Sequence, residues 1–149
     1  MAKLRVGDPW MSAPDYGRSL SGLTVNLLVA DVAVAVAFQT RVLGASVRYQ
    51  DADFAVLYGY DAEWMLHADH TYHDHPMIGA VAGLEARGGG VELRLHGCDP
   101  DRAEAAARSH DYLVLDGAAD KPHGLREVFI VDPDGYVWVP DLAAGSDLA

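Results

Sequence analysis

The stretch that decides the fold runs from His123 to Asp141, HGLREVFIVDPDGYVWVPD. Two runs rich in β-branched and aromatic residues, 128–131 and 136–139, flank the tetrapeptide Asp-Pro-Asp-Gly at 132–135. Pro133 presets the backbone φ angle of a turn, and Gly135 supplies the positive φ that closes it. The pattern predicts a β-hairpin. Because the hairpin is apolar on both faces, we expect it inside a sheet that is covered on both sides.

Length and composition limit the classes of protein to consider. The chain has 149 residues, half of them apolar, which is enough for one domain with a sizeable core. Its formal net charge of -11 disfavours nucleic acid and acidic membrane surfaces as partners. Cys98 is the single cysteine, so no internal disulfide can form. The sequence begins with the charged stretch MAKLRVGDPW and has no apolar run of about 20 residues, so we expect a cytoplasmic protein.

The first half of the chain predicts the order strand, helix and three strands. Residues 23–30 alternate as a strand, Asp31 suits a helix N-cap, and Gly44 suits the C-cap. Residues 32–37 also alternate, but the spacing of Val36, Gln39 and Leu43 favours a helix over 32–43. Three short strands are expected at 46–50, 54–60 and 63–68.

The second half repeats this order. Residues 91–96 predict a strand, Asp99 caps a helix, and a strand at 112–115 precedes the hairpin. The predicted fold is therefore α+β: two βαβββ modules, at about 23–69 and 91–141, form a curved mixed sheet around a cleft. The linker is 70–90, and 23–149 form a single domain. Residues 1–22 predict an irregular N-terminal arm, either disordered or packed through Trp10, Met11 and Tyr16 on its own domain or on a partner.

Several segments resemble the vicinal oxygen chelate superfamily, which includes glyoxalase I, the bleomycin and fosfomycin resistance proteins and the extradiol dioxygenases. The resemblance covers residues 23–141. It rests on the segments Leu27-Leu28-Val29-Ala30-Asp31-Val32, Ala37-Phe38, Arg41-Val42-Leu43-Gly44 and Phe129-Ile130-Val131-Asp132-Pro133-Asp134-Gly135. It implies the fold described above and, for the bleomycin-resistance branch, a homodimer. It is far less specific for activity, because the superfamily hosts many chemistries.

The resemblance also implies where a metal site would lie. The family takes one ligand from each of four strands, and the matching positions here are Thr24, His67, Glu92 and Val139. Threonine is a poor ligand and valine cannot bind a metal at all. We therefore expect no metal cofactor, and a divalent ion, if one binds, would use His67 and Glu92.

Strand alternation predicts which side chains face the cleft. Along 91–96 the polar positions share one face, and the apolar positions should pack on the helix. The same alternation applied to the first strand and to the hairpin adds further positions, and the resemblance adds His67. The predicted ligand-binding set is Thr24, Asn26, His67, Glu92, Arg94, Glu127, Phe129 and Val139. Buried carboxylates need partners, and Arg94 and Arg126 are the nearest candidates for Glu92 and Glu127.

Each of these residues also has a purely structural interpretation. The pair of Glu92 and Arg94 fits a structural ion pair as well as a ligand-recognising one. His70, His73 and His75 lie in a polar loop, where solvated histidines are more common than a zinc site. Cys98 is expected to be buried and inert. The aromatic residues Trp64, Tyr136 and Trp138 are expected in the core.

Two functions fit these observations best, and no catalytic residue can be named. The first is a glyoxalase/bleomycin-resistance-like protein that binds a small organic molecule in its cleft without a metal. The alternative is a divalent-metal-dependent lyase, isomerase or dioxygenase in which the ion polarises substrate oxygens. Metal-free acid–base chemistry through Glu92 or Glu127 is a third option. Whether the chain is an enzyme is left open, and binding without metal is slightly favoured.

Overall fold

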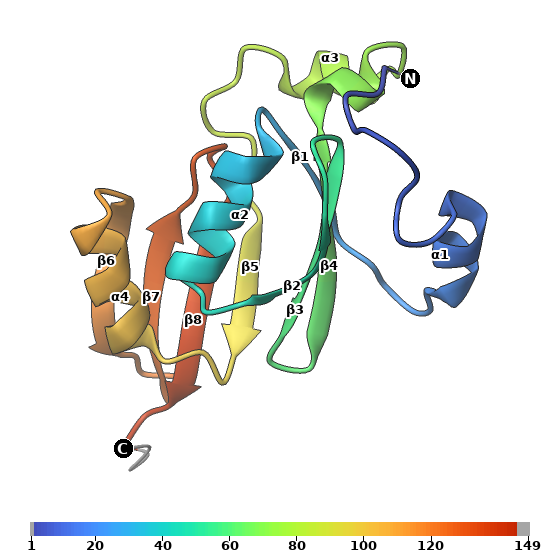
Figure 1. Cartoon of the computed structure of the whole chain (residues 1–149). Helices are drawn as coiled ribbons and strands as arrows, with labels where there is room; N and C mark the ends of the chain where they lie inside the picture. The colour runs from blue at the N-terminus through green and yellow to red at the C-terminus, as the bar shows by residue number, and fades with distance from the viewer. Residues whose placement is uncertain (1, 146–149) are drawn as a thin grey trace.

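The computed structural model describes residues 2–145 and shows two four-stranded sheets, each with a helix packed on one face (Figure 1). Sheet A has the strand order β1-β4-β3-β2, and sheet B has the order β5-β8-β7-β6. The elements are α1 (Ala13–Ser19), β1 (Asn26–Val29), α2 (Val32–Arg41), β2 (Ser46–Gln50), β3 (Phe54–Gly59), β4 (Ala62–Ala68), η1 (Asp69–Tyr72), α3 (Met77–Val81), β5 (Glu92–His96), α4 (Pro100–Ser109), β6 (Leu113–Asp120), β7 (Leu125–Val131) and β8 (Val137–Ala143).

The two sheets have the same topology, which confirms the predicted α+β fold of two βαβββ modules. In each module the first strand runs parallel to the last, and the remaining pairs are antiparallel. The connection between the parallel strands contains the module's helix, α2 or α4. Asp31 and Asp99 cap these helices by accepting hydrogen bonds from first-turn amides, as their positions after a strand predict.

One apolar core joins both modules. Alternation places Leu27 and Leu66 of sheet A, and Val128 and Ile130 of sheet B, in the same buried cluster as the helices. Trp64 and Trp138 meet across it, with ring centroids 5.5 Å apart. The helix-side faces of the two sheets therefore share a core, and their opposite faces point away from it.

The closing hairpin is held by its own carboxylates. Asp132 is 7% exposed and accepts hydrogen bonds from the amides of Asp134 and Tyr136 and from the Trp138 indole. The Asp134 carboxylate accepts a bond from the Ala30 amide, which ties this turn to the first module. Burial raises the pKa of Asp132 to about 6, although the three donors act in the opposite direction.

Several predicted boundaries differ from the structure. The helix α2, predicted over 32–43, ends at Arg41, and the strand β1, predicted from 23, begins at Asn26. The arm is not wholly irregular, because α1 forms within it, with Pro14 in its first turn and Ser12 as its N-cap. The linker contains η1 and α3, which the glycine-rich sequence did not indicate.

Among residues 2–145, none of the helices has the length and apolar character that crossing a bilayer requires.

Candidate functional site: a cavity beneath the N-terminal arm

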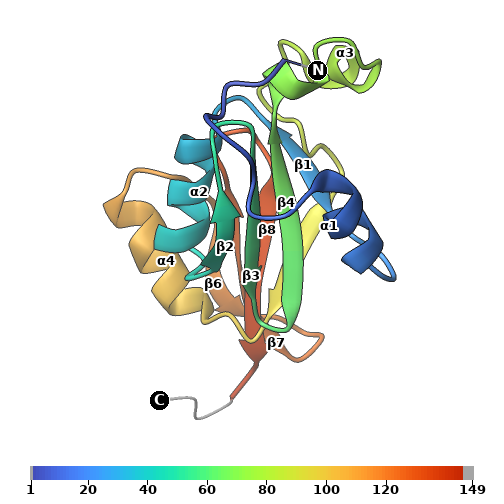
Figure 2. The same cartoon turned by 45° about the vertical axis from the view of Figure 1, so that its right-hand side comes forward.

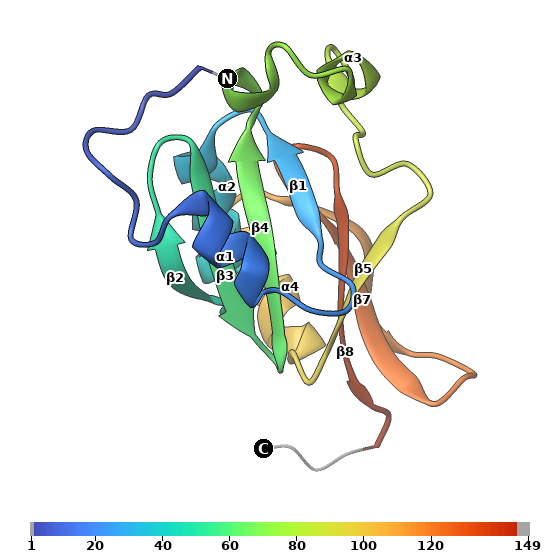
Figure 3. The ribbon, with the colours of Figure 1, turned by 90° about the vertical axis from the view of Figure 1, so that its right-hand side faces the viewer.

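The N-terminal arm crosses the face of sheet A that points away from the helices. Figure 3 shows α1 lying in front of β4, and Figure 2 shows α1 on one side of sheet A with α2 and α4 on the other. Trp10 stacks on Tyr49, with ring centroids 5.7 Å apart, and Tyr16 meets Phe54 edge-on at 5.9 Å. The arm therefore packs on its own module rather than extending into solvent.

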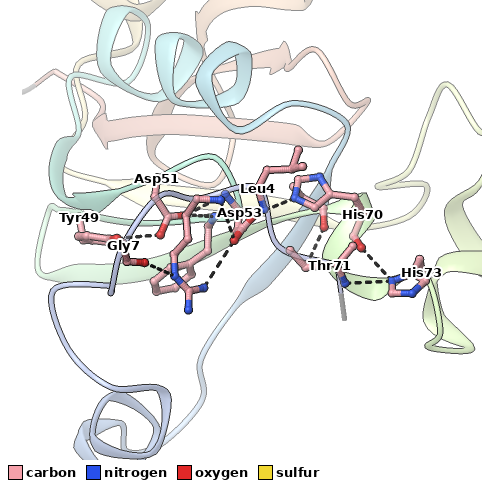
Figure 4. Close-up of polar contacts among 12 residues, drawn as sticks. Leu4, Gly7, Tyr49, Asp51, Asp53, His70, Thr71 and His73 are labelled. Carbon is pink, nitrogen blue, oxygen red and sulfur yellow. Dashed lines mark hydrogen bonds and ion pairs between the residues drawn. The ribbon is translucent and has the colours of Figure 1, made fainter.

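A buried carboxylate anchors the start of the arm. Asp53 is 2% exposed and accepts hydrogen bonds from the Leu4 amide at 2.6 Å, from the Arg5 amide at 3.3 Å and from His70 Nε2 at 2.8 Å (Figure 4). The Arg5 guanidinium adds a longer contact of 3.5 Å. Burial alone would raise the pKa of Asp53, but these hydrogen bonds outweigh it and lower the pKa. An ionised Asp53 thus favours the docked arm.

A cavity of about 290 Å³ lies between the arm and sheet A. Its wall is largely aromatic and aliphatic, with charged groups toward the start of the arm. The lining residues are Lys3, Arg5, Pro9, Trp10, Met11, Ala13, Tyr16, Gly17, Leu20, Asp51, Asp53, Phe54, Met65, His67 and Thr71. An apolar hollow with few polar groups is typical of a small-molecule site, and this volume is near the lower end of the range for such sites.

His67 is the polar residue in the middle of this wall. Its register places it beside Leu28 and Phe54, and its ring lies 5.0 Å from that of Phe54. Nδ1 lies 2.5 Å from Oδ1 of Asn26, whose amide nitrogen donates to the Tyr72 hydroxyl. Burial lowers the pKa of His67 to about 4, and the nearby Lys3 ammonium adds to the effect.

The protonation of His67 follows from these contacts. At neutral pH the ring is uncharged, and the Asn26 carbonyl oxygen requires the proton on Nδ1. Nε2 is then an acceptor, and it has no hydrogen-bond partner in the part of the chain that the structure describes. His67 can therefore accept a hydrogen bond from a ligand in the cavity.

A second polar cluster lies on the outer face of sheet B. Arg94 contacts Glu127, and it also reaches Glu92 at 3.2 Å and Asp141 at 3.4 Å. His96 bonds to Asp141 at 2.8 Å. Glu127 and Asp141 are buried, whereas the Glu92 side chain is 47% exposed. Arg94 thus partners both predicted glutamates.

The charged groups of this cluster neutralise one another, as in an ion-pair network with a structural role. Burial opposes ionisation of Glu127, but hydrogen bonds from Arg94 and His123 outweigh it and lower the pKa of that carboxyl. A low pKa does not suit the general base that metal-free acid–base chemistry would need. The other candidate partner, Arg126, lies on the helix side and pairs with Asp101 and Asp120.

The structure divides the eight predicted site residues between two faces. Thr24, Asn26 and His67 belong to the first module, and of these only His67 lines the cavity. The other five lie on sheet B: Glu92, Arg94, Glu127, Phe129 and Val139. No hydrogen bond or ion pair among residues 2–145 joins the two groups. Sequence reasoning did not single out Asp53, Phe54 or Met65 as cavity residues. Strand alternation places Phe54 and Met65 on the same face as His67, whereas Asp53 precedes the strand and gave no such signal.

The remaining candidates have structural surroundings. His73 and His75 are exposed at the surface, and His70 holds Asp53. Within the described residues, no group of three or more His, Cys, Asp or Glu side chains has metal-binding geometry. Cys98 is fully buried, and burial raises the pKa of its thiol, as expected for an inert cysteine. Trp64, Tyr136 and Trp138 lie in the core, as predicted.

The four positions that match the family's metal ligands do not fit a metal ion. Val139 has no donor atom and is fully buried, and Thr24 offers only a hydroxyl. The Glu92 carboxylate pairs with Arg94, so binding a metal would require breaking that contact. His67 and Glu92 alone offer good ligand atoms, they lie on different sheets, and a stable site needs at least three ligands.

A repeated βαβββ topology with an aromatic cavity on one sheet defines a class of small two-module α+β proteins. The family model of the Glyoxalase/Bleomycin resistance protein/Dioxygenase superfamily matches residues 23–139, so the chain belongs to that superfamily. Among curated proteins, none matches the sequence significantly.

Three solved structures illustrate the shared fold. One is a glyoxalase/bleomycin resistance protein/dioxygenase from Nocardioides, with 20% identity, a TM-score of 0.61 and coverage of 91% of this chain and 96% of that chain. A family enzyme from Burkholderia phytofirmans PsJN has 14% identity, a TM-score of 0.67 and coverage of 80% and 96%. TioX from Micromonospora sp. ML1 has 20% identity, a TM-score of 0.60 and coverage of 85% and 98%. At these identities the likeness concerns the fold alone.

Proposed function

We propose that the chain is a metal-independent binding protein that holds a small organic molecule in the cavity beneath its N-terminal arm. The supporting observation is the cavity itself, whose wall is mostly apolar and contains a neutral histidine with a free acceptor atom. A ligand there would stack between Trp10 and Phe54 and accept or donate few hydrogen bonds. Its burial would be favoured by removal of aromatic surface from water.

The competing function is a divalent-metal-dependent lyase, isomerase or dioxygenase of the same superfamily. It would need His67 and Glu92 to act together with further ligands. The two residues lie on different sheets, and Glu92 already contacts Arg94. Binding without a metal accounts for Val139 and Thr24 at the ligand positions, and the metal-dependent mechanism does not.

We further propose that the protein is a homodimer and that the outer face of sheet B contacts the second copy. The register places Leu113 and Val137 in line with Val131 on this face, and Leu113 is 61% exposed. Val131 and Val137 are half-buried, and an apolar strip that leaves a side chain such as Leu113 exposed is often a contact surface. Sedimentation of Leu113→Glu should then give a monomer, whereas an unchanged dimer would exclude this face.

Binding is tested with a thermal-shift screen of small aromatic acids, amides and amines against protein stripped of metal by EDTA. Compounds that stabilise the wild type should not stabilise Gly17→Phe, because Gly17 lines the cavity and has open space where the new side chain would lie. Gly79→Phe provides the control, since Gly79 also faces open space but lies outside the cavity.

Metal analysis of the same preparations distinguishes the two functions. The proposal predicts no stoichiometric divalent ion that resists dialysis. A tightly held ion that is lost in both His67→Ala and Glu92→Ala would favour the metal-dependent enzyme and overturn the proposal.

A further inference from the structure

The cavity contains one cation that the protein does not neutralise. Lys3 and Arg5 both line it. The Arg5 guanidinium contacts the Asp53 carboxylate, whereas the Lys3 ammonium has no hydrogen bond or ion pair within residues 2–145. Lys3 nevertheless lies close enough to His67 to help lower the pKa of that ring. An unpaired ammonium beside an aromatic wall favours a ligand with a negative charge.

The other acidic side chain on the wall besides Asp53 is Asp51, and it does not favour a cationic ligand. Both oxygens of Asp51 are occupied: one accepts from the amides of Asp53 and Phe54, and the other accepts from the Tyr49 hydroxyl. Because these bonds fix the turn that leads into β3, a cation would have to compete with them. A ligand anion beside Lys3 has no hydrogen bond or ion pair of that ammonium to break among residues 2–145.

The size and lining of the cavity limit the shape of the ligand. A cavity of roughly 150 Å³ holds one benzene ring. The volume of about 290 Å³ is therefore sufficient for two fused rings. Tyr16 on the arm meets Phe54 on the sheet, Trp10 lies beside Tyr16, and flat aromatic surfaces of this kind favour a planar guest.

We infer that the ligand is a planar aromatic carboxylate of about two rings, whose charge lies beside Lys3 and whose rings lie against Phe54 beneath the arm. This inference rests on the proposed function, since it names the chemical class of ligand for the same cavity. The ring system supplies most of the affinity, and Lys3 supplies the preference for an anion over a neutral molecule of the same shape.

The test compares naphthalene-2-carboxylate with naphthalene-2-carboxamide, which has nearly the same shape and no charge. Dissociation constants are measured by titration calorimetry at low salt for the wild type, Lys3→Gln and Lys121→Gln. Lys121 is the other lysine of the chain; it pairs with Asp116 and lies outside the cavity. Because the ion pair between Lys3 and the ligand carboxylate would be partly exposed, we expect the wild type to bind the carboxylate about fivefold more tightly than the carboxamide.

The expected result is that Lys3→Gln abolishes this preference and leaves the affinity for the carboxamide unchanged, which also shows that the arm is still docked. Lys121→Gln should retain the preference. High salt should weaken binding of the carboxylate only. Equal affinities of the two compounds in the wild type, or a preference that survives Lys3→Gln, would overturn the inference and leave the proposed function standing. If neither compound bound, the inference would be overturned, and the thermal-shift screen with Gly17→Phe would decide the proposed function separately.

Discussion

Replacing Asp53 with alanine should release the N-terminal arm while the rest of the chain stays folded. Asp53 immediately precedes β3 of sheet A, and its carboxylate accepts hydrogen bonds from the amides of Leu4 and Arg5 in the arm. These contacts join segments 48 and 49 residues apart in the sequence, so no local structure replaces them when the carboxylate is removed.

The magnitude follows from the number of good hydrogen bonds. The bonds from Leu4 at 2.6 Å and from His70 at 2.8 Å are short, while the Arg5 contacts at 3.3 and 3.5 Å add less. Only the Arg5 and Leu4 bonds hold the arm directly. A hydrogen bond to a charged group contributes about 1.5–3 kcal/mol, so the docked arm should lose about 2–3 kcal/mol. This corresponds to a 30- to 150-fold larger population of the undocked state.

Hydrogen exchange of the Leu4 amide reports the loss of this bond together with the undocking of the arm. In the wild type this amide should exchange slowly, and in Asp53→Ala about 30- to 150-fold faster, while the amides of Leu57 and Leu66 in the core should change much less. Asp8→Ala removes the same charge from an exposed position on the arm and should leave Leu4 protected. Equal protection of Leu4 in the wild type and in Asp53→Ala would refute this account of the anchor.

Three further predictions concern stability in urea. Because burial lowers the pKa of His67 from 6.5 to about 4, the unfolded chain takes up this proton first as pH falls. The contribution of His67 to the free energy of unfolding should therefore be complete above pH 6.5 and decrease toward pH 4, with a loss of about 1–2 kcal/mol at pH 5. The variant His67→Asn should lack this pH dependence. Glu127→Ala should lower the free energy of unfolding by about 2 kcal/mol, because Arg94 loses a buried partner. Glu92→Ala, at an exposed position, should lower it by under about 0.5 kcal/mol. Similar losses in the two variants would exclude the difference in burial as the cause. Gly135→Ala should lower the free energy of unfolding by more than about 2 kcal/mol, because its Cβ would lie 2.1 Å from the Glu85 carbonyl oxygen. Gly124 has a similar φ but faces open space, so Gly124→Ala should lower it by about 1 kcal/mol. Equal losses would show that φ alone matters.

Local signals predicted the fold well. The turn residues at 132–135, the caps Asp31 and Asp99 and the alternation of the strands each act over a few residues, so they can be read from sequence. The helix α1 was missed even though Ser12 and Pro14 are typical start residues, because Gly17 in so short a segment argues against a helix. Alternation also assigned Arg94 and Glu127 to one face of sheet B, where the structure has them in contact.

The cavity could not be predicted in the same way. It depends on the arm folding back onto β3 and β4, through contacts such as that between Tyr16 and Phe54. Nothing in the local sequence of the arm specifies which surface it covers. Asp53 was expected only as part of a tight connection between strands, and its function as the anchor of the arm becomes visible only when Leu4 and His70 are placed around it.

The most direct test of the central claim is the NMR signal of the methionine methyl groups during titration with naphthalene-2-carboxylate in EDTA. Met11 and Met65 line the cavity, whereas Met77 is 45% exposed and lies outside it. A ligand beneath the arm should shift the signals of Met11 and Met65 through its ring currents and leave Met77 unchanged. Saturating shifts at Met77 without shifts at Met11 and Met65, or no shift at any of the three, would contradict binding in this cavity.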